Sequence, residues 1–142
     1  CGCDHVIDYG REDFVARVRE ITEGRGVPVV YDGVGAATFA GSLDCLSPRG
    51  MMVSFGNASG AVPPFSPGIL SQKGSLFLTR PTLAHYTATR AELLDSAAAF
   101  FEVVLQGLVR VEIGQRYPLS DAAQAHRDLE ARRTTGATVL LP

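Results

Sequence analysis

Two glycine-rich segments, each directly after an apolar run, have the residue types that best fit ligand binding. Residues 33–35 (Gly-Val-Gly) follow the apolar residues 29–31, and residues 56–60 (Gly-Asn-Ala-Ser-Gly) follow the continuous run 51–55. Such a continuous run is typical of a parallel strand covered on both faces. Glycine lets the backbone approach a flat or charged group, and ligands of open α/β sheets bind at the carboxyl ends of strands. The loop after residue 55 is therefore predicted to line a ligand site.

The earlier glycine segment does not complete a dinucleotide-binding fingerprint. That fingerprint needs a third glycine and an acidic residue about 20 positions later. Thr38 occupies the place of the third glycine, and the sequence around residue 54 is Val-Ser-Phe. We interpret residues 33–38 as a tight strand-to-helix turn beside the site.

No group of residues has the spacing of a nucleophile, a general base or a metal centre. The three histidines are scattered at positions 5, 85 and 126, and His126 is predicted to be a core residue on an apolar helix face. The cysteines at positions 1, 3 and 45 lack the spacing of a zinc site or disulfide framework, which favours reduced thiols in a cytosolic protein. We therefore predict no catalytic side chain and no metal, with chemistry supplied by a cofactor.

Two single residues at predicted strand ends have two interpretations each. Tyr9 follows a β-like run and could stack on a purine or donate to a phosphate, or it could be a half-buried surface tyrosine. Arg80 precedes Pro81 and could bind a phosphate bidentately or form a structural salt bridge.

The hydrophobic pattern predicts an α/β fold. Strands are expected at 6–9, 27–31, 51–55 and 75–79, and helices at 12–22, 38–46 and 69–72. This alternation indicates a parallel sheet with crossover helices. A helix over 89–106 with a capping box and a buried apolar stripe follows, then a strand at 109–113, a helix at 119–132 and a strand at 137–141. We assign residues 1–106 and 107–142 to different domains.

Composition excludes several classes of protein. The chain has 142 residues, 46% of them hydrophobic and 20% charged, with a net charge of −2, as expected for a globular protein without bulk attraction to nucleic acid or anionic lipid. No apolar run approaches the roughly 18 to 20 residues of a membrane span. The first residues do not resemble a signal peptide, and the missing initiator methionine leads us to expect a fragment of a longer protein.

Several motifs, in this order and spacing, resemble one family across essentially the whole chain: His5–Tyr9, Val30–Gly35, Ser42–Leu46, Gly50–Gly60, Ile69–Leu83, Tyr117–Ala122 and Ala125–Glu130. That family is the zinc-free medium-chain dehydrogenases/reductases of the NADPH:quinone oxidoreductase (ζ-crystallin-like) branch. The resemblance implies the second part of a Rossmann domain, a doubly wound parallel sheet, followed by a C-terminal segment that returns to a GroES-like catalytic domain. The glycine-rich loop and the quinone-binding residues of the family are missing from this chain.

The resemblance also implies a set of NADPH-binding residues. Tyr9 would lie by the adenosine 2′-phosphate, Val34 by the adenine, and Phe55 and Gly56 by the nicotinamide ribose. The loop of Ala58, Ser59, Gly60 and Ala61 and the segment of Pro81, Thr82 and Leu83 would continue that wall. Arg132 would reach the cofactor from the returning catalytic domain.

The implied activity is hydride transfer from NADPH to a quinone or enone in a cytoplasmic homodimer formed through strand Ser75–Thr79, with the fragment alone inactive. Two alternatives stay open, namely a non-catalytic ζ-crystallin-like binding or structural protein and an enoyl-reductase domain of a polyketide synthase. The acidic pI and the lack of a basic, aromatic-laced face count against RNA binding.

The family's strand order, 3-2-1-4-5-6, implies that this chain carries strands 3 to 6 only. The strand at 6–9 would then have no neighbour, and the strands at 109–113 and 137–141 should pair with the missing catalytic domain. We expect the chain to rearrange, swap or associate in order to cover its strand edges.

Overall fold

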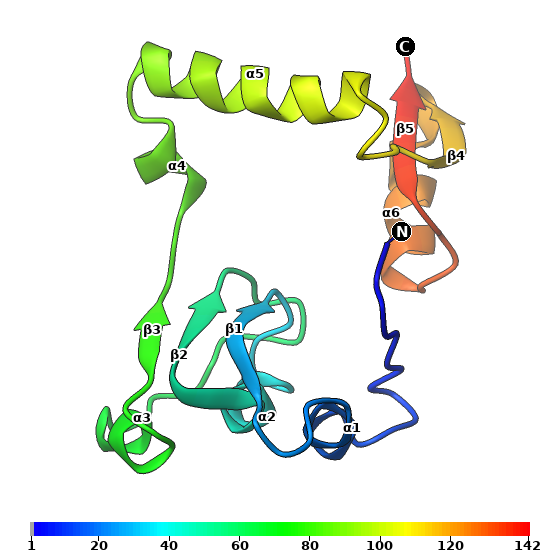
Figure 1. Cartoon of the computed structure of the whole chain (residues 1–142). Helices are drawn as coiled ribbons and strands as arrows, with labels where there is room; N and C mark the ends of the chain where they lie inside the picture. The colour runs from blue at the N-terminus through cyan, green and yellow to red at the C-terminus, as the bar shows by residue number, and fades with distance from the viewer. Residues whose placement is uncertain (1) are drawn as a thin grey trace. The chain divides into compact units, whose positions relative to one another are not determined.

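The N-terminal part of the chain is built around the expected parallel sheet (Figure 1). The computed structural model describes residues 2–142, which form two units, Gly2–Ala88 and Thr89–Pro142. Within the first unit, strands β1 (Val27–Asp32), β2 (Leu46–Ser54) and β3 (Phe77–Thr79) lie in the order β1-β2-β3. All pairings are parallel, with Asp32 opposite Ser54 and Met51 opposite Phe77. The mixed α/β fold with parallel strands is as predicted, whereas the domain boundary at residues 106 and 107 stays a prediction.

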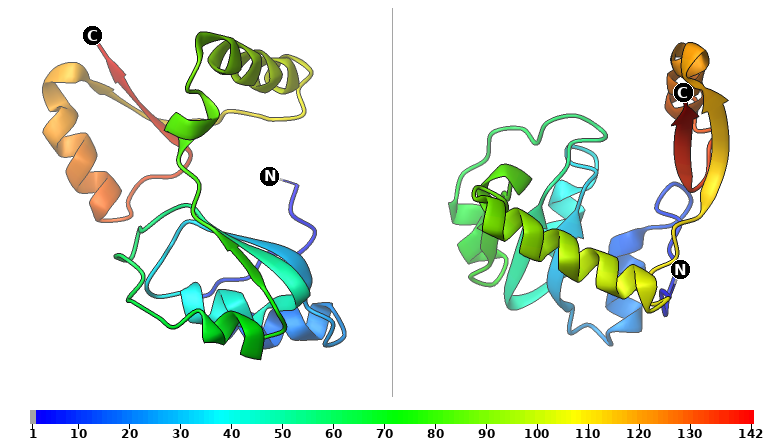
Figure 2. Two further views of the ribbon diagram at one scale, coloured as in Figure 1. Left: turned by 90° about the vertical axis from the view of Figure 1, so that its left-hand side faces the viewer. Right: turned by 90° about the horizontal axis from the view of Figure 1, so that it is seen from above.

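The helices of the first unit pack on one face of this sheet (Figure 2). They are α1 (Phe14–Ile21), α2 (Phe39–Asp44) and α3 (Gly68–Gln72), while the short α4 (Leu83–Tyr86), which the sequence did not predict, follows β3 with Leu83 and Tyr86 exposed. Phe39 and Leu43 of α2 are buried against Leu46 and Met52 of β2, and residues of α3 add to this cluster. Burial of each such side chain contributes about 1.5–3 kcal/mol, so this cluster holds the sheet and α2 together.

The other face of the sheet is open within residues 2–88. Met52 and Ser54 are buried, whereas Tyr31 of β1 is 73% exposed and Phe55, just after β2, is 55% exposed. The prediction that residues 51–55 are covered on both faces is therefore wrong for this unit. The reason is that the apolar side chains of α2 and α3 all reach the Met52 side.

The predicted strand at residues 6–9 is absent, and the prediction is wrong. Val6 is 85% exposed, and the backbone instead turns at Asp8, whose carbonyl accepts from Arg11 N (2.8 Å) and Glu12 N (2.9 Å). A β-like segment without a neighbouring strand has nothing to pair its amides, so it stays irregular. This outcome agrees with the expectation that the segment lacks a neighbour.

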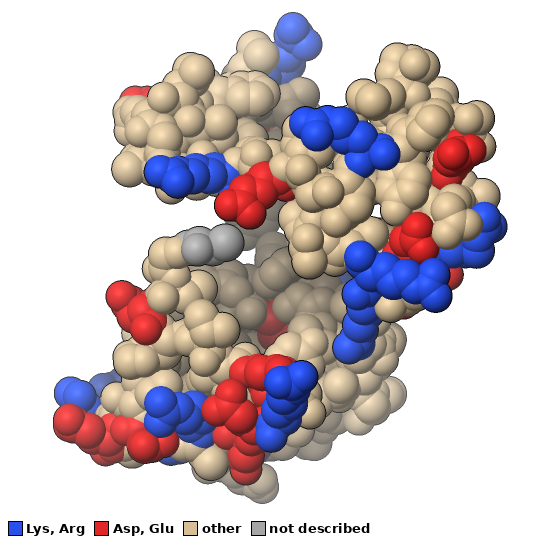
Figure 3. All heavy atoms as spheres, turned by 90° about the vertical axis from the view of Figure 1, so that its right-hand side faces the viewer, with Lys and Arg blue, Asp and Glu red and all other residues tan. Residues whose placement is uncertain are grey.

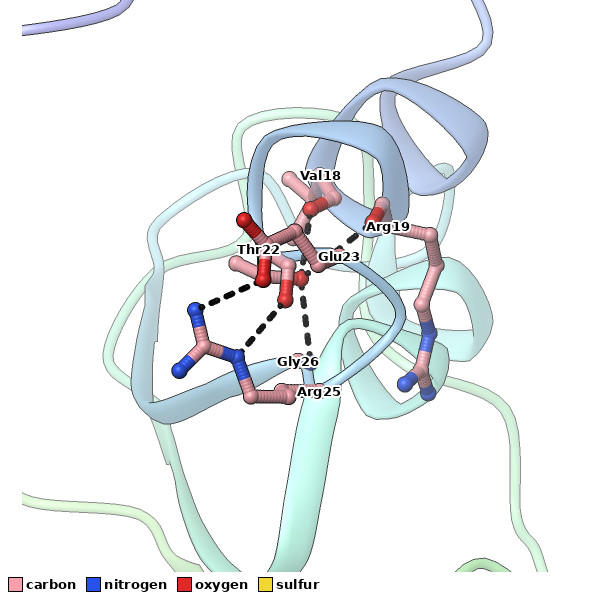
Figure 4. A network of polar contacts seen from close by, with 6 residues as sticks. All are labelled: Val18, Arg19, Thr22, Glu23, Arg25 and Gly26. Carbon is pink, nitrogen blue, oxygen red and sulfur yellow. Dashed lines mark hydrogen bonds and ion pairs between the residues drawn. The ribbon is translucent and has the colours of Figure 1, made fainter.

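Polar contacts fix the end of α1 next to the start of β1 (Figure 4). The Thr22 hydroxyl donates to the Val18 carbonyl (2.8 Å) and accepts from Gly26 N (3.0 Å), and Arg25 Nε donates to the Thr22 carbonyl (3.1 Å). Arg19 donates to three carbonyls, at Gly24 (2.8 Å), Asp44 (2.5 Å) and Leu46 (3.4 Å). These contacts lie at the amino ends of β1 and β2.

The second unit contains α5 (Arg90–Leu105), β4 (Ile113–Pro118), a 3₁₀ turn (Leu119–Asp121), α6 (Ala122–Glu130) and β5 (Ala137–Leu141). The predicted capping box is confirmed: the Thr89 hydroxyl accepts from Glu92 N, and Glu92 accepts from Thr89 N. The predicted strand at 109–113 is wrong, because the strand runs over 113–118, where it pairs in parallel with β5.

Two predictions of buried side chains in this unit are also wrong. None of the residues of α5 is buried, and Phe100 and Phe101 contact each other with ring centroids 5.8 Å apart. His126 in α6 is exposed, although it was expected in the core. An apolar stripe becomes buried only where another element covers it, and no element of residues 89–142 covers α5.

Candidate functional site

Asp32, the last residue of β1, organises the turn that follows this strand. Its carboxylate accepts hydrogen bonds from Val34 N (2.8 Å) and Gly35 N (3.0 Å), and from the hydroxyls of Thr38 and Ser42 (2.8 Å each). Thr38 lies at the N-cap position of α2, but its hydroxyl donates to Asp32 and makes no capping bond. The buried carboxylate therefore joins the end of β1, the glycine turn and the start of α2.

Asp32 is only 4% exposed, yet its surroundings favour the charged form. Burial raises the pKa of this carboxyl, but the hydrogen bonds from Gly35, Ser42, Thr38 and Val34 outweigh burial, and the pKa lies below its usual value. The side chain is thus a fixed negative charge whose hydrogen bonds hold two backbone amides and two hydroxyls in place.

Ser59 connects the loop after β2 to the turn after β1. Its hydroxyl donates to the Val34 carbonyl (2.8 Å) and accepts from Ala37 N (2.9 Å), while its own amide donates to Val34 O (2.7 Å). Two further backbone bonds join the same loops, Ala58 N to Gly33 O (3.2 Å) and Ala36 N to Gly60 O (3.1 Å). The two glycine segments singled out in the sequence therefore form one continuous wall.

Glycine is required where these two segments meet. A Cβ on Gly56 would lie 2.3 Å from the Gly33 carbonyl oxygen, and a Cβ on Gly33 would lie 2.9 Å from the Phe55 ring. Gly35 adopts φ +90°, which disfavours other residues, and a Cβ there would lie 2.6 Å from Gly60 O. The glycines thus allow close packing of the two loops and support the exposed Phe55 ring.

Tyr9 and Val34 come together although they lie on different elements. Both line an open cavity of about 280 Å³, and its lining also includes Ile7, Phe14, Val30 and Asp32. The cavity lies beside β1, whose second edge has no strand partner among residues 2–142. A flat, largely apolar group would fit this surface.

The remaining predicted residues fall into three places. Ala61 lines a second cavity of about 290 Å³ together with Arg80 and Asn57. Pro81 and Thr82 follow β3, and Leu83 begins α4 with its side chain exposed. Arg132 belongs to the second unit, where it takes φ +56° just after α6. Its predicted contact with the cofactor stays a prediction.

Arg80 does not form the structural salt bridge considered from the sequence, and its phosphate contact stays a prediction. Its Nη1 atom donates to the backbone carbonyls of Ser54 (2.8 Å) and Gly56 (3.3 Å), at the carboxyl end of β2. None of the ion pairs found in residues 2–142 includes Arg80. Sequence reasoning also missed Asp32 as the organiser of the turn, although an aspartate at a strand end before Gly-x-Gly is a usable signal.

Charged side chains outside this site pair with one another at the surface. Such pairs are Arg11 with Asp8 (3.3 Å), Arg133 with Asp128 (3.3 Å), Arg17 with Glu20, and Lys73 with Asp44. Figure 3 shows acidic and basic side chains interspersed on the face that it displays. Solvated pairs of this kind contribute at most about 1 kcal/mol each, so they do not define a site.

The described residues hold no visible metal centre or membrane span. Among residues 2–142 no three His, Cys, Asp or Glu side chains are placed to share a metal ion. None of the helices in that range is long and apolar enough to cross a bilayer.

Known proteins resemble this chain closely over almost all its length. A family model described as zinc-binding dehydrogenase matches residues 1–140. A quinone oxidoreductase of Pseudomonas aeruginosa is 54% identical over 141 residues, which are 99% of this chain and 43% of that protein. A 2-haloacrylate reductase of a Burkholderia species is 45% identical, again over 99% of this chain and 43% of the relative.

A solved structure shows the same arrangement of elements. The crystal structure of Escherichia coli quinone oxidoreductase complexed with NADPH matches with a TM-score of 0.94 and 50% identity, over 99% of this chain and 44% of that one. The chain thus spans less than half the length of the relatives that it matches.

The parallel sheet with glycine loops at its carboxyl ends defines an α/β protein of the Rossmann type. More specifically, the chain belongs to the zinc-binding dehydrogenase family, and within it corresponds to the C-terminal part of the quinone oxidoreductases. This confirms the family relationship that the sequence motifs indicated.

Proposed function

We propose that this chain is the cofactor-binding part of an NADPH-dependent oxidoreductase that reduces a quinone or enone. The observation that carries the proposal is the wall formed by the turn after β1 and the loop after β2, joined by Ser59 and Asp32. It lies at the carboxyl ends of parallel strands, where such folds bind dinucleotides. A relative with the same fold at 50% identity was crystallised with NADPH.

The residues present fit a dinucleotide. The cavity beside Tyr9 and Val34 is lined mostly by apolar side chains and has room for a flat base, while Gly33 and Gly56 let the two loops of the wall pack closely against each other. NADPH, when bound, supplies the hydride. In this proposal Tyr9 and Val34 hold the adenosine end, and Phe55, Gly56 and residues 58–61 and 81–83 form the wall on the nicotinamide side. Arg132 would contact the cofactor from the second unit.

The chemistry needs little from these side chains beyond binding and orientation. The Asp32 carboxylate is satisfied by four hydrogen bonds, and residues 2–142 hold no cluster that could bind a metal. From the resemblance to the zinc-free branch of the family, we propose a zinc-independent hydride transfer with no covalent protein intermediate. The acceptor would bind against residues that this chain does not contain.

NADPH titration tests the proposal. The 142-residue chain and a full-length protein that carries it are each titrated with NADPH and NADH, followed by nicotinamide fluorescence, and then assayed with a quinone. We expect turnover and tight NADPH binding in the full-length protein only, with weaker NADH binding. A full-length protein that binds neither nucleotide would refute the cofactor assignment and favour a non-catalytic ζ-crystallin-like role.

The acceptor is tested separately. The likeness to a 2-haloacrylate reductase favours an activated carbon–carbon double bond as a second candidate acceptor beside quinones. Turnover of a small enone but not a quinone would support that choice. A strict requirement for an acyl thioester would instead support an enoyl-reductase domain of a polyketide synthase.

The assembly and location belong to the same proposal. β3 is an edge strand among residues 2–142, and its Phe77 is 58% exposed, which supports a homodimer formed through residues 75–79. Cys3 and Cys45 are free thiols, which supports a cytoplasmic protein. We also propose that residues 1–106 belong to the cofactor domain and residues 107–142 to a GroES-like catalytic domain.

A further inference from the structure

Arg80 lies where β3 ends, and its guanidinium contacts the neighbouring strand. One nitrogen, Nη1, donates to the carbonyls of Ser54 and Gly56, the two residues that flank Phe55. Carbonyls at the end of a strand have no partner in the sheet, and a charged donor forms stronger hydrogen bonds with them than a neutral one. Arg80 thereby holds the carbonyl on each side of Phe55, and we call these two hydrogen bonds the Arg80 bracket.

The same turn is held from the opposite side by β1. Phe55 N (2.9 Å) and Gly56 N (3.3 Å) both donate to the Asp32 carbonyl. The amides of the turn thus face β1, while its carbonyls face Arg80. With both sides held, the backbone at residues 55 and 56 has one orientation.

The turn at residues 55 and 56 packs closely against the turn after β1, so its orientation affects both loops. The position of a Cβ on Gly56 is 2.3 Å from Gly33 O, and that of a Cβ on Gly33 is 2.9 Å from the Phe55 ring. A small rotation of the turn would therefore displace both the Phe55 ring and the turn after β1. The two loops can only keep their contact if the carbonyls of Ser54 and Gly56 stay in place.

We propose that Arg80 is a positioning residue for the cofactor. It fixes the Phe55–Gly56 turn in the orientation that receives the nicotinamide side of NADPH, and it acts through the backbone without touching the cofactor. The identity of the ligand rests on the proposed function. The bracket itself is a property of this chain.

The test compares two arginines that make the same kind of contact. Arg80→Met removes the bracket, and Arg80→Lys restores a charged donor on a shorter side chain. Arg19→Met is the matched control, because Arg19 also donates to backbone carbonyls but at the amino ends of the strands. Each variant is made in the full-length protein that carries this chain. Amide hydrogen exchange at residues 55 and 56 is measured without cofactor, and the NADPH dissociation constant by fluorescence.

We expect Arg80→Met to speed exchange at residues 55 and 56 and to raise the NADPH dissociation constant, each by about tenfold or more, as loss of a charged hydrogen bond predicts. Arg80→Lys should recover most of both losses, and Arg19→Met should leave the dissociation constant within about twofold even where it lowers Tm. If Arg80→Met does not fold, Arg80→Gln takes its place.

Three outcomes would overturn the inference. If both exchange and NADPH affinity are unchanged in Arg80→Met, the bracket has no positioning role. If exchange is unchanged but NADPH binds more weakly, Arg80 contacts the cofactor directly. Equal losses of affinity in Arg80→Met and Arg19→Met would show a general loss of stability. If the unmodified protein does not bind NADPH, the proposed function fails, and the positioning role fails with it, whatever the exchange data show.

Discussion

Asp32 illustrates how a residue can be essential to a site without contacting the ligand. Four donors surround its carboxylate, and together they join β1, the Gly33–Gly35 turn and α2. Asp32→Asn keeps one acceptor oxygen but places an NH₂ group against the hydroxyls of Thr38 and Ser42. We expect this variant to lose about 1–3 kcal/mol of unfolding free energy at neutral pH, measured by urea titration.

The stability lost in Asp32→Asn should depend on pH in a defined direction. Because the pKa of folded Asp32 lies below its unfolded value, the stabilisation is complete above the ordinary carboxyl range and is lost as pH falls through the folded pKa. The stability gap between the natural protein and Asp32→Asn should therefore be constant near neutrality and shrink below about pH 4. Asp44→Asn, which alters a surface ion pair, is the control. A gap that widened in acid would contradict the assignment.

The cofactor contact of Ser59 stays a prediction, and its hydroxyl also links the two loops, because it donates to Val34 O and accepts from Ala37 N. Ser59→Ala should lower the unfolding free energy by about 1 kcal/mol and weaken NADPH binding severalfold, because the two loops lose a direct link. Ser59→Thr should retain both hydrogen bonds. Ser71→Ala, at an exposed serine in α3, provides the control. Normal affinity in Ser59→Ala would show that the remaining backbone bonds suffice.

These residues show what the sequence could predict about the site. Glycines after apolar runs located both loops, because that pattern depends only on local backbone requirements. The tasks of Ser59 and Arg80 depend on which loop lies next to which, and such contacts span 20 or more residues of sequence. Local sequence patterns therefore do not predict which distant residues come into contact.

Among the elements, the strands with both an apolar run and a partner inside the chain were predicted well, whereas β4 pairs with β5 but was expected at 109–113. β1 and β5 lie close to their expected positions, since each has a strongly apolar run and a parallel neighbour, whereas β2 begins earlier than expected, at Leu46. Residues 6–9 have a similar β-like composition but no neighbour, and they form no strand. Likewise α5 forms as expected from its capping box, yet its apolar side chains stay exposed.

The segment at residues 6–9 gives a direct test of this interpretation. In the 142-residue chain its amides should exchange with solvent at nearly the unfolded rate, whereas amides of β1 and β2 in the paired ladder should be protected. Hydrogen exchange resolved by residue measures both sets in one experiment. Full protection of residues 6–9 in a proven monomer would mean that the chain finds another partner for this strand.

At the level of the whole molecule, the sheet of residues 2–88 has two free edges. β1 and β3 each pair only with β2, and both present exposed aromatic side chains, Tyr31 on β1 and Phe77 on β3. Exposed edges of this kind favour association with another chain or segment. The two edges are expected to behave differently in the full-length protein. In the family's strand order an earlier strand lies next to β1, so that edge would be covered, whereas the edge at β3 would stay free.

Phe77→Lys distinguishes the two edges, because a charge on β3 opposes pairing through that strand. In the full-length protein we expect this variant to shift the mass measured by light scattering from dimer to monomer, with Tm changed by only a few degrees. Tyr31→Lys on β1 is the matched control, and it should leave the dimer intact, since the preceding strand would already cover that edge. If Tyr31→Lys dissociates the protein and Phe77→Lys does not, association uses β1, and the proposed dimer through residues 75–79 is wrong.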